Sequence, residues 1–477
     1  MPNYWKNVTI KTGFTAQDGS AVSTGNHTGG LCGKMLCENS DHEGMAMADR
    51  TEANQNDICR DRISRGGKDA VFTRAMKKTH TILLPQMLEY HSPFLQAAFE
   101  GSGYRFAVMQ GGNGLKNKAH QYINSDYCYP GVLIVGQFLD ALENGMYPPD
   151  RVAFMEPQAG GACRAGNYYQ VIRNTMKKSG HGQVPVISLN YKGQEKQPGF
   201  QITPRLFLNA MAAVCFGDLV MSLYQQVKPY ERRKGETDEV RKRLENDLMA
   251  SIRKGCLREK DRQAAYRHIL EGFGGIPVDR RNKKRVGISG EIYIKFSSLG
   301  NHRLEDYLDR QDCQIFMGSF VNYCIYVLDS DYRSYLIDHT RPVLRAGYEA
   351  ALRFLKKVQR GMFRAVEEYG RFETDLTFDE LKKRADQISG CDCITGDGWL
   401  VAAEAAEAIE MGCRHVLIVH PFGCLVSHVC ERGVLNRLRS LYPHVNIQTI
   451  EYDYDSSATL RESRIMMALG EFVNSSL

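Results

Sequence analysis

The 477-residue chain lacks the short motifs that would assign a reaction at once. It has no Gly-x-x-x-x-Gly-Lys-Ser/Thr phosphate loop, no Gly-x-Ser-x-Gly nucleophile elbow and no His-Glu-x-x-His metal helix. These absences argue against the hydrolases that use an elbow serine or a helix-bound zinc. If ATP drives this protein, another subunit has to bind the nucleotide.

The sequence also lacks a membrane or export signal. No apolar run reaches the ~18 residues of a membrane span, and Met1–Lys6 lack the apolar stretch of a signal peptide. The net charge of +6 is small for this length, and basic residues alternate with acidic ones. The basic cluster Arg280–Arg285 is typical of a solvated loop, with a partner or phosphate contact as the alternative. We expect a cytoplasmic protein that binds neither membrane nor nucleic acid.

Cysteine, by contrast, is plentiful, with fourteen residues in the chain. A reducing compartment does not favour a disulfide framework. Cys215, Cys324 and Cys413 lie inside apolar helical or strand patterns, which is typical of small core residues. The other cysteines lie beside glycine, proline or polar residues and need a different explanation.

The length predicts two or three domains. Residues 1–75 are rich in Gly, Ser, Thr, Asn and Asp and show no sustained periodicity, yet they hold Cys32, Cys37 and Cys59. Such a segment buries little apolar surface alone, so it has to be disordered, docked on the main body or tied down by a metal. The three cysteines favour the metal.

Residues 76–200 alternate between short apolar runs and helical patterns, which predicts a parallel sheet covered on both faces. Residues 201–280 are predicted to be helical, and residues 281–477 form a second alternating unit. The fold class is therefore α/β, with two Rossmann-like parallel-sheet domains, a helical insert and a loop-rich N-terminal segment. A long amphipathic run, Asp331–Tyr369, is predicted to break near Pro342. The two units are candidates for related folds.

Three cysteines lie in loops of the two predicted sheets. They are Cys128, Cys163 and Cys424. Loops that follow parallel strands gather at one edge of the sheet, where such folds place their sites. Glycines before Cys163 and Cys424 let the backbone pass close to a bulky group. Cys424 lies between an apolar strand and a helix-like run over residues 426–441, where the helix dipole favours the thiolate.

Together with Cys32, Cys37 and Cys59, these residues give six candidate thiolates. Iron-sulfur clusters are held by cysteine thiolates at irregular spacings, whereas structural zinc usually shows two close pairs. The chain has at most one such pair, Cys32 and Cys37. Spacing alone leaves three interpretations open: an iron-sulfur cluster, a zinc site and a scatter of unligated cysteines.

Four segments resemble the iron-sulfur half of the activase-associated 2-hydroxyacyl-CoA dehydratase superfamily. The resemblance is nearest to its large activase-related branch and to the double-cubane cluster proteins. Further matching positions include Gly287–Ile292 and Gly398–Leu400. The four segments are Asn124–Pro130, Gly160–Tyr168, Pro185–Asn190 and His420–Leu425.

The resemblance implies that a separate ATP-hydrolysing iron-sulfur activase delivers electrons at very low potential to a cluster on this chain. In the double-cubane relatives two 4Fe-4S units share a bridging sulfide and use six thiolates, so it implies an 8Fe-9S cluster, with a single 4Fe-4S cluster as the alternative. It also implies a homodimer. The chain departs from the family at Val426-Ser427 and at Ala159 and Ala162, and neither departure removes a thiol.

The leading functional hypothesis is an oxidoreductase component that reduces a small, hard-to-reduce molecule. The alternatives are a dehydratase subunit that uses radical one-electron chemistry on a 2-hydroxyacyl-CoA, and a non-enzymatic cluster carrier or scaffold. Arg164 is a candidate to offset cluster charge, or else an exposed helix-start residue. His428 is a candidate proton donor, or else a hydrogen-bonded structural histidine. Cys59 is the least certain sixth ligand, with Cys430 as its substitute.

Overall fold

Two parallel sheets organise the computed structural model, which describes residues 69–112, 114–157, 163–189, 197–255, 258–338 and 342–470. The described residues belong to one compact unit. Cys32, Cys37 and Cys59, with the rest of the loop-rich segment up to residue 68, lie outside the described residues. Their predicted role as ligands therefore stays a prediction.

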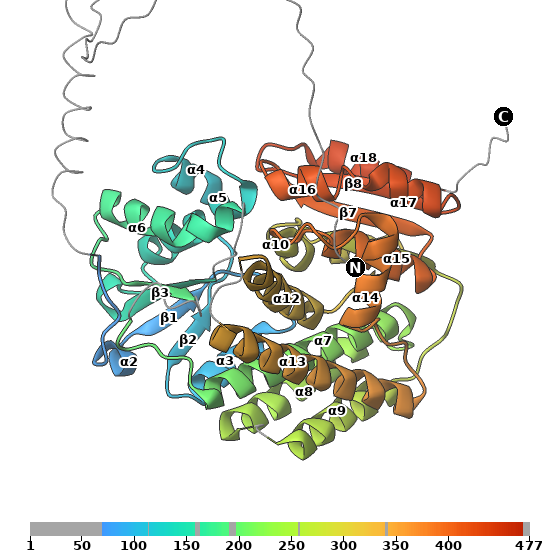
Figure 1. The fold of residues 1–477 in the computed structure, drawn as a ribbon, viewed down its shortest axis with the longest axis horizontal. Helices are drawn as coiled ribbons and strands as arrows, with labels where there is room; N and C mark the ends of the chain where they lie inside the picture. Colours follow the sequence, from blue (N-terminus) through green and yellow to red (C-terminus); the bar gives the residue numbers. More distant parts are fainter. Residues whose placement is uncertain are drawn as a thin grey trace, which may run out of the picture. The chain divides into compact units, whose positions relative to one another are not determined.

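The first sheet has the strand order β2-β1-β3-β4, with all neighbours parallel. Residues alternate between its faces: Leu83 and Phe154 pack toward α5 and α6, whereas Ile82 and Met155 pack on the side of α3. Figure 1 shows this sheet in blue and teal. Its elements are α2 (Met76–Thr79), β1 (Thr81–Leu84), α3 (Ser92–Glu100), β2 (Arg105–Val108), α4 (Leu115–His120), α5 (Tyr129–Glu143), η1 (Pro149–Arg151), β3 (Val152–Pro157), η2 (Arg164–Asn167), α6 (Tyr168–Lys178) and β4 (Val186–Leu189).

The second sheet repeats this arrangement, because its order β6-β5-β7-β8 is again second, first, third and fourth in the chain. Leu417 and Val419 share a core with Leu83 and Phe154 of the first sheet, so apolar packing is continuous between the two sheets. Its elements are β5 (Lys284–Gly290), α10 (Ile292–Phe296), α11 (Leu304–Arg310), β6 (Cys313–Met317), α12 (Phe320–Asp338), α13 (Pro342–Tyr369), α14 (Phe378–Ile388), α15 (Leu400–Glu410), β7 (His415–Pro421), α16 (Leu425–Cys430), α17 (Leu435–Leu441), β8 (Asn446–Tyr452) and α18 (Ala458–Leu469).

The predicted fold class is confirmed for the described residues, which form two Rossmann-like parallel sheets with helices between and around them. In each sheet the second strand lies on one side of the first strand and the third strand lies on the other side, so the strand order reverses between the first and third strands. The carboxyl ends of strands at such a reversal are where open α/β sheets bind ligands. The reversal lies between β1 and β3 in the first sheet and between β5 and β7 in the second.

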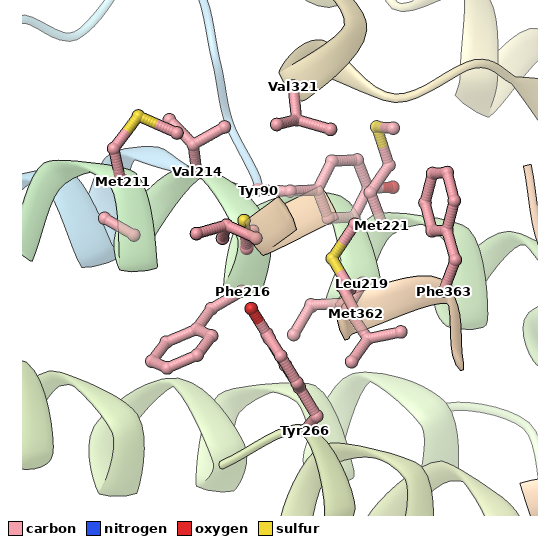
Figure 2. Packing of buried hydrophobic residues seen from close by; sticks show 14 of the residues in the cluster. Tyr90, Met211, Val214, Phe216, Leu219, Met221, Tyr266, Val321, Met362 and Phe363 are labelled. Atoms are coloured by element: carbon pink, nitrogen blue, oxygen red, sulfur yellow. The ribbon is translucent and has the colours of Figure 1, made fainter. Parts of the chain in front are cut away.

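A helical layer follows the first sheet and contains α7 (Pro204–Val227), η3 (Lys228–Tyr230), α8 (Glu236–Lys254) and α9 (Glu259–Gly274). Helix α13, which lies between β6 and β7 in the chain, packs beside α9 in this layer (Figure 1). Figure 2 shows α7 side chains such as Phe216 and Leu219 facing Tyr266 of α9 and Met362 and Phe363 of α13. This shared core joins the insert to both sheets.

Helix α7 corrects the expectation that no apolar run is long enough to span a membrane. The segment Pro204–Tyr230 is long and apolar enough to cross one. In its most apolar window, 78% of the residues are buried inside the protein. The helix is apolar nearly all round because other helices surround it. It is therefore a buried core helix of the described fold.

Two predicted helical runs have different outcomes. The break near Pro342 is confirmed, since α12 ends at Asp338 and α13 begins at Pro342. The single helix expected over residues 426–441 is wrong, because α16 ends at Cys430 and α17 begins only at Leu435. A Cβ on Gly433 would lie 2.2 Å from the Val429 carbonyl oxygen, so glycine permits the tight turn between the two helices.

A buried ion pair ties α10 to α15 and gives a stability test. The Lys295 ammonium lies 2.9 Å from the Glu404 carboxylate, with side chains 0% and 4% exposed. Lys295→Met leaves Glu404 without its partner and should cost about 3–5 kcal/mol of unfolding free energy. Burial raises the pKa of Glu404. The folded variant should therefore hold a proton that the unfolded chain releases, and its stability should fall as pH rises from about 5 to about 8.

Urea unfolding at several pH values measures both effects. The control is the double variant Lys295→Met/Glu404→Leu, which removes the orphaned acid and should recover most of the lost stability. Equal stabilities for wild type and Lys295→Met would contradict the assignment.

Candidate functional site

Each of the three described candidate ligands is the residue immediately before a helix. Cys128 precedes α5, Cys163 precedes η2 and Cys424 precedes α16, all with extended backbone angles. Cys163 follows the third strand of the first sheet, and Cys424 follows the third strand of the second sheet. The repeated topology thus puts both at equivalent positions beside the reversal point.

Backbone contacts bring the two sheet edges together at these cysteines. The Tyr129 N–H donates to the Phe422 carbonyl at 3.2 Å, across the two sheets. Gly423 has φ +75°, and a Cβ there would lie 3.2 Å from the Cys128 Cα. The glycine that the sequence places before Cys424 therefore permits both the left-handed turn and the close approach of the Cys128 backbone.

The third cysteine is joined to the same place through Arg164. Its guanidinium donates to the Asp126 carbonyl at 2.9 Å, which links the turn of Cys163 to the loop that leads into Cys128. The same guanidinium lies 5.7 Å from the centre of the Tyr127 ring. The segment 126–129 therefore contacts both other cysteine-bearing turns.

Each sulfur lies beside groups that can form hydrogen bonds to it. The Ser427 N–H and hydroxyl lie 3.4 Å and 3.1 Å from the Cys424 Sγ. The Tyr168 hydroxyl is 2.8 Å from the Cys128 Sγ. Backbone hydrogen bonds from Gly131 and Ala165 lower the pKa of Cys128 and Cys163, respectively, though burial dominates. Donors of this kind stabilise a thiolate and tune the potential of an iron-sulfur cluster.

Burial outweighs these hydrogen bonds. It raises the pKa of Cys128 and Cys424 and raises the pKa of Cys163 to about 12. At Cys424, burial therefore outweighs the dipole effect expected from the sequence, because α16 has only six residues and the sulfur is mostly removed from water. A cation that binds here has to displace protons from the thiols.

Glu291 is the acidic neighbour that the three thiols share. It follows β5 at the reversal point of the second sheet, and its carboxylate accepts from the Ile294 N–H at 2.9 Å. Its charge raises the pKa of Cys128, Cys163 and Cys424, after the larger effect of burial. This common influence agrees with the backbone contacts in bringing the three cysteines to one region.

Further buried carboxyl groups border this region. Burial raises the pKa of Glu291 to about 7 and raises the pKa of Asp397 and Glu431 well above the ordinary range. Low-dielectric surroundings disfavour the charged form of these acids, as they do for the thiolates. The carboxyl groups and the thiols of this region therefore share one electrostatic environment.

The two predicted catalytic residues lie on the outside of these turns. His428 is exposed, and its Nδ1 donates to the Cys424 carbonyl oxygen at 2.7 Å, so the ring supports the turn. Arg164 is exposed, and its positive charge lowers the pKa of Cys128 slightly against burial. The geometry favours supporting roles, and proton delivery by His428 stays a prediction.

Sequence reasoning missed several residues of this region. Glu291 and Asp397 lie in segments that match the superfamily or adjoin such a match, but their types alone suggested no role. Tyr168 also lies in a matching segment, but no role for it was expected, because its contact with Cys128 joins residues 40 positions apart. Of the cysteines assigned to the core, Cys215 and Cys413 are buried and Cys324 is partly buried.

The donor set fits an iron-sulfur cluster in its chemistry. In the described part of the chain, no three His, Cys, Asp or Glu side chains converge closely enough to hold one metal ion. Cluster thiolates bind separate irons, so they do not need to meet at one point. Three partly or fully buried thiols on converging turns, with N–H donors at their sulfurs, suit such a group.

Ser427→Ala tests the hydrogen bonding at Cys424. Loss of the hydroxyl donor should destabilise the thiolate by about 1 kcal/mol and slow alkylation of Cys424 roughly fivefold at a fixed alkaline pH. The measurement is iodoacetamide labelling of the metal-free chain, followed by peptide mass spectrometry. Ser427→Thr keeps the hydroxyl and serves as the control. An unchanged rate in Ser427→Ala would refute the bond.

Comparison with known proteins adds no family assignment to this geometry. No family model matches the chain, and no curated protein matches it significantly. The function is therefore inferred from the site and from the sequence resemblance.

Proposed function

We propose that this chain is the iron-sulfur, electron-accepting component of an ATP-driven two-component reductase. It would receive low-potential electrons from a separate activase and pass them to a small substrate. The observation that carries the proposal is the convergence of Cys128, Cys163 and Cys424 at the touching edges of two sheets. When bound, an iron-sulfur cluster supplies storage and transfer of single electrons.

The chain's own residues would hold this group and shield it. Cys128, Cys163 and Cys424 would provide thiolates, and the N–H groups of Gly131, Ala165 and Ser427 would donate to sulfur. Burial excludes water from the thiols, which low-potential chemistry requires. The positive charge of Arg164 would partly offset negative charge on the bound group.

The number of thiolates bears on the type of cluster. Three described cysteines suffice for one cubane with one iron free of protein thiolate, whereas Cys32, Cys37 and Cys59 would complete a double cubane. Cys430 remains the substitute for Cys59 as the sixth ligand, and its sulfur lies 3.0 Å from that of Cys393. The 8Fe-9S double cubane is therefore the leading cofactor, and a single 4Fe-4S cluster is the alternative.

The electron donor in this proposal is a separate ATP-hydrolysing iron-sulfur activase, because the chain has no phosphate loop of its own. We place the protein in the cytoplasm and expect a homodimer by analogy with the superfamily it resembles. A small molecule that is hard to reduce is the expected substrate.

A second candidate is a dehydratase subunit that uses radical chemistry on a 2-hydroxyacyl-CoA. The observation that favours it is that three described cysteines are enough for a single cubane. The double-cubane alternative requires the cysteines before residue 69 as well.

Iron and sulfide analysis of anaerobically purified protein tests the proposal. About eight irons per chain would support the double cubane, and about four would support the dehydratase-like arrangement. Cys128→Ser, Cys163→Ser and Cys424→Ser should each lower the iron content, whereas the matched control Cys215→Ser should not, because Cys215 lies in the core beside α9.

Unchanged iron in all three variants would defeat the ligand assignment. A wild-type chain that carries one zinc and no iron would remove the proposed function altogether.

A further inference from the structure

Two cysteines other than the three described candidate ligands lie close to each other. Cys393 is in the loop between α14 and α15, and Cys430 is the last residue of α16. Their sulfur atoms are 3.0 Å apart, although 37 positions separate the residues in the chain. Two thiols at this distance need to move only about 1 Å closer to reach the bond length of a disulfide.

The two thiols differ in their access to solvent. Cys393 is exposed, whereas Cys430 is only 8% exposed and lies behind it. Burial raises the pKa of Cys430 to about 12, and the neighbouring Cys393 thiol adds to this shift. A reagent in solution therefore reacts first with Cys393, whereas Cys430 is accessible mainly to the Cys393 sulfur.

The backbone holds Cys393 in place opposite Cys430. The Cys393 carbonyl accepts from the Tyr326 hydroxyl at 3.3 Å and from the Trp399 N–H at 3.2 Å. A Cβ on Gly398 would lie 2.1 Å from this same carbonyl, so the loop closes tightly over it. The backbone position of Cys393 is thus set by contacts with α12 and with the start of α15.

We propose that Cys393 and Cys430 form a redox-active dithiol whose substrate is a low-molecular-weight disulfide. The Cys393 thiolate attacks one sulfur of that disulfide, and one small thiol leaves with the proton that Cys393 lost. The Cys430 sulfur then attacks the Cys393 sulfur, and the second small thiol leaves with the proton of Cys430. The protein loses two electrons and two protons to form one internal disulfide, and the small disulfide gains them.

The internal bond would tie the loop before α15 to α16. This loop carries Asp397, whose charge raises the pKa of Cys163 and Cys424, and α16 begins directly after Cys424. The dithiol therefore lies next to the proposed cluster site. The chemistry uses no metal, so it does not rest on the proposed function.

The test exposes the full chain to oxidised glutathione under anaerobic conditions and maps cysteine states by differential alkylation and peptide mass spectrometry. Wild type should form a Cys393–Cys430 disulfide. Cys430→Ser should instead keep glutathione on Cys393, at a level roughly tenfold above wild type, because no second thiol releases it. Cys391→Ser is the matched control and should behave as wild type, since Cys391 is 5% exposed and its thiol donates to the Lys382 carbonyl.

Far-UV circular dichroism checks that each variant folds. If Cys430→Ser does not fold, the mapping of the Cys393–Cys430 disulfide in wild type still tests the proposal. Equal, stable glutathione adducts on Cys393 in wild type and Cys430→Ser would overturn the proposal. It would also fall if Cys430→Ser lost as much iron as Cys424→Ser, since Cys430 would then be a metal ligand.

Discussion

The contact between the Cys128 turn and the Phe422-Gly423 turn is the constraint on which the site depends. One hydrogen bond from the Tyr129 N–H and one close backbone approach at Gly423 join the carboxyl edges of two separate sheets. Without this contact, each cysteine would lie at the edge of its own sheet with no partner from the other. A larger residue at position 423 would have to adopt a strained φ and push against the Cys128 backbone.

The electrostatic character of the site follows from the same contact. When two sheet edges meet, the thiols and the carboxyl group of Glu291 lose water, and burial raises their pKa values. Burial disfavours the charged form of both kinds of group, because bare anions are costly to remove from water. Such a region tolerates a charged inorganic group that replaces thiol protons, and it keeps solvent away from that group.

Much of the fold could be predicted from the sequence because it depends on local patterns. The apolar runs of β3, β4 and β8, the turn before Cys424 and the break at Pro342 all carry signals within a few residues. The division between α16 and α17 was missed because most residues of the run suit a helix, and the turn that separates the two helices depends on the close approach that Gly433 permits. The apolar length of α7 was also missed, and only its packing separates a core helix from a membrane span.

The site could be predicted only in part. That Cys128, Cys163 and Cys424 lie at sheet edges follows from strand and loop order, but their distance from one another depends on how two sheets meet. The pairing of Cys393 with Cys430 depends on the same long-range packing, as does the burial that overrides the helix dipole at Cys424. Periodicity along one chain contains no information about contacts between segments that are distant in sequence.

Anomalous diffraction from anaerobically grown crystals, recorded on both sides of the iron absorption edge, tests the central claim most directly. The account predicts strong iron density bounded by the sulfur atoms of Cys128, Cys163 and Cys424. Iron density elsewhere in the molecule, or no iron with these three sulfurs in van der Waals contact with protein atoms only, would contradict it.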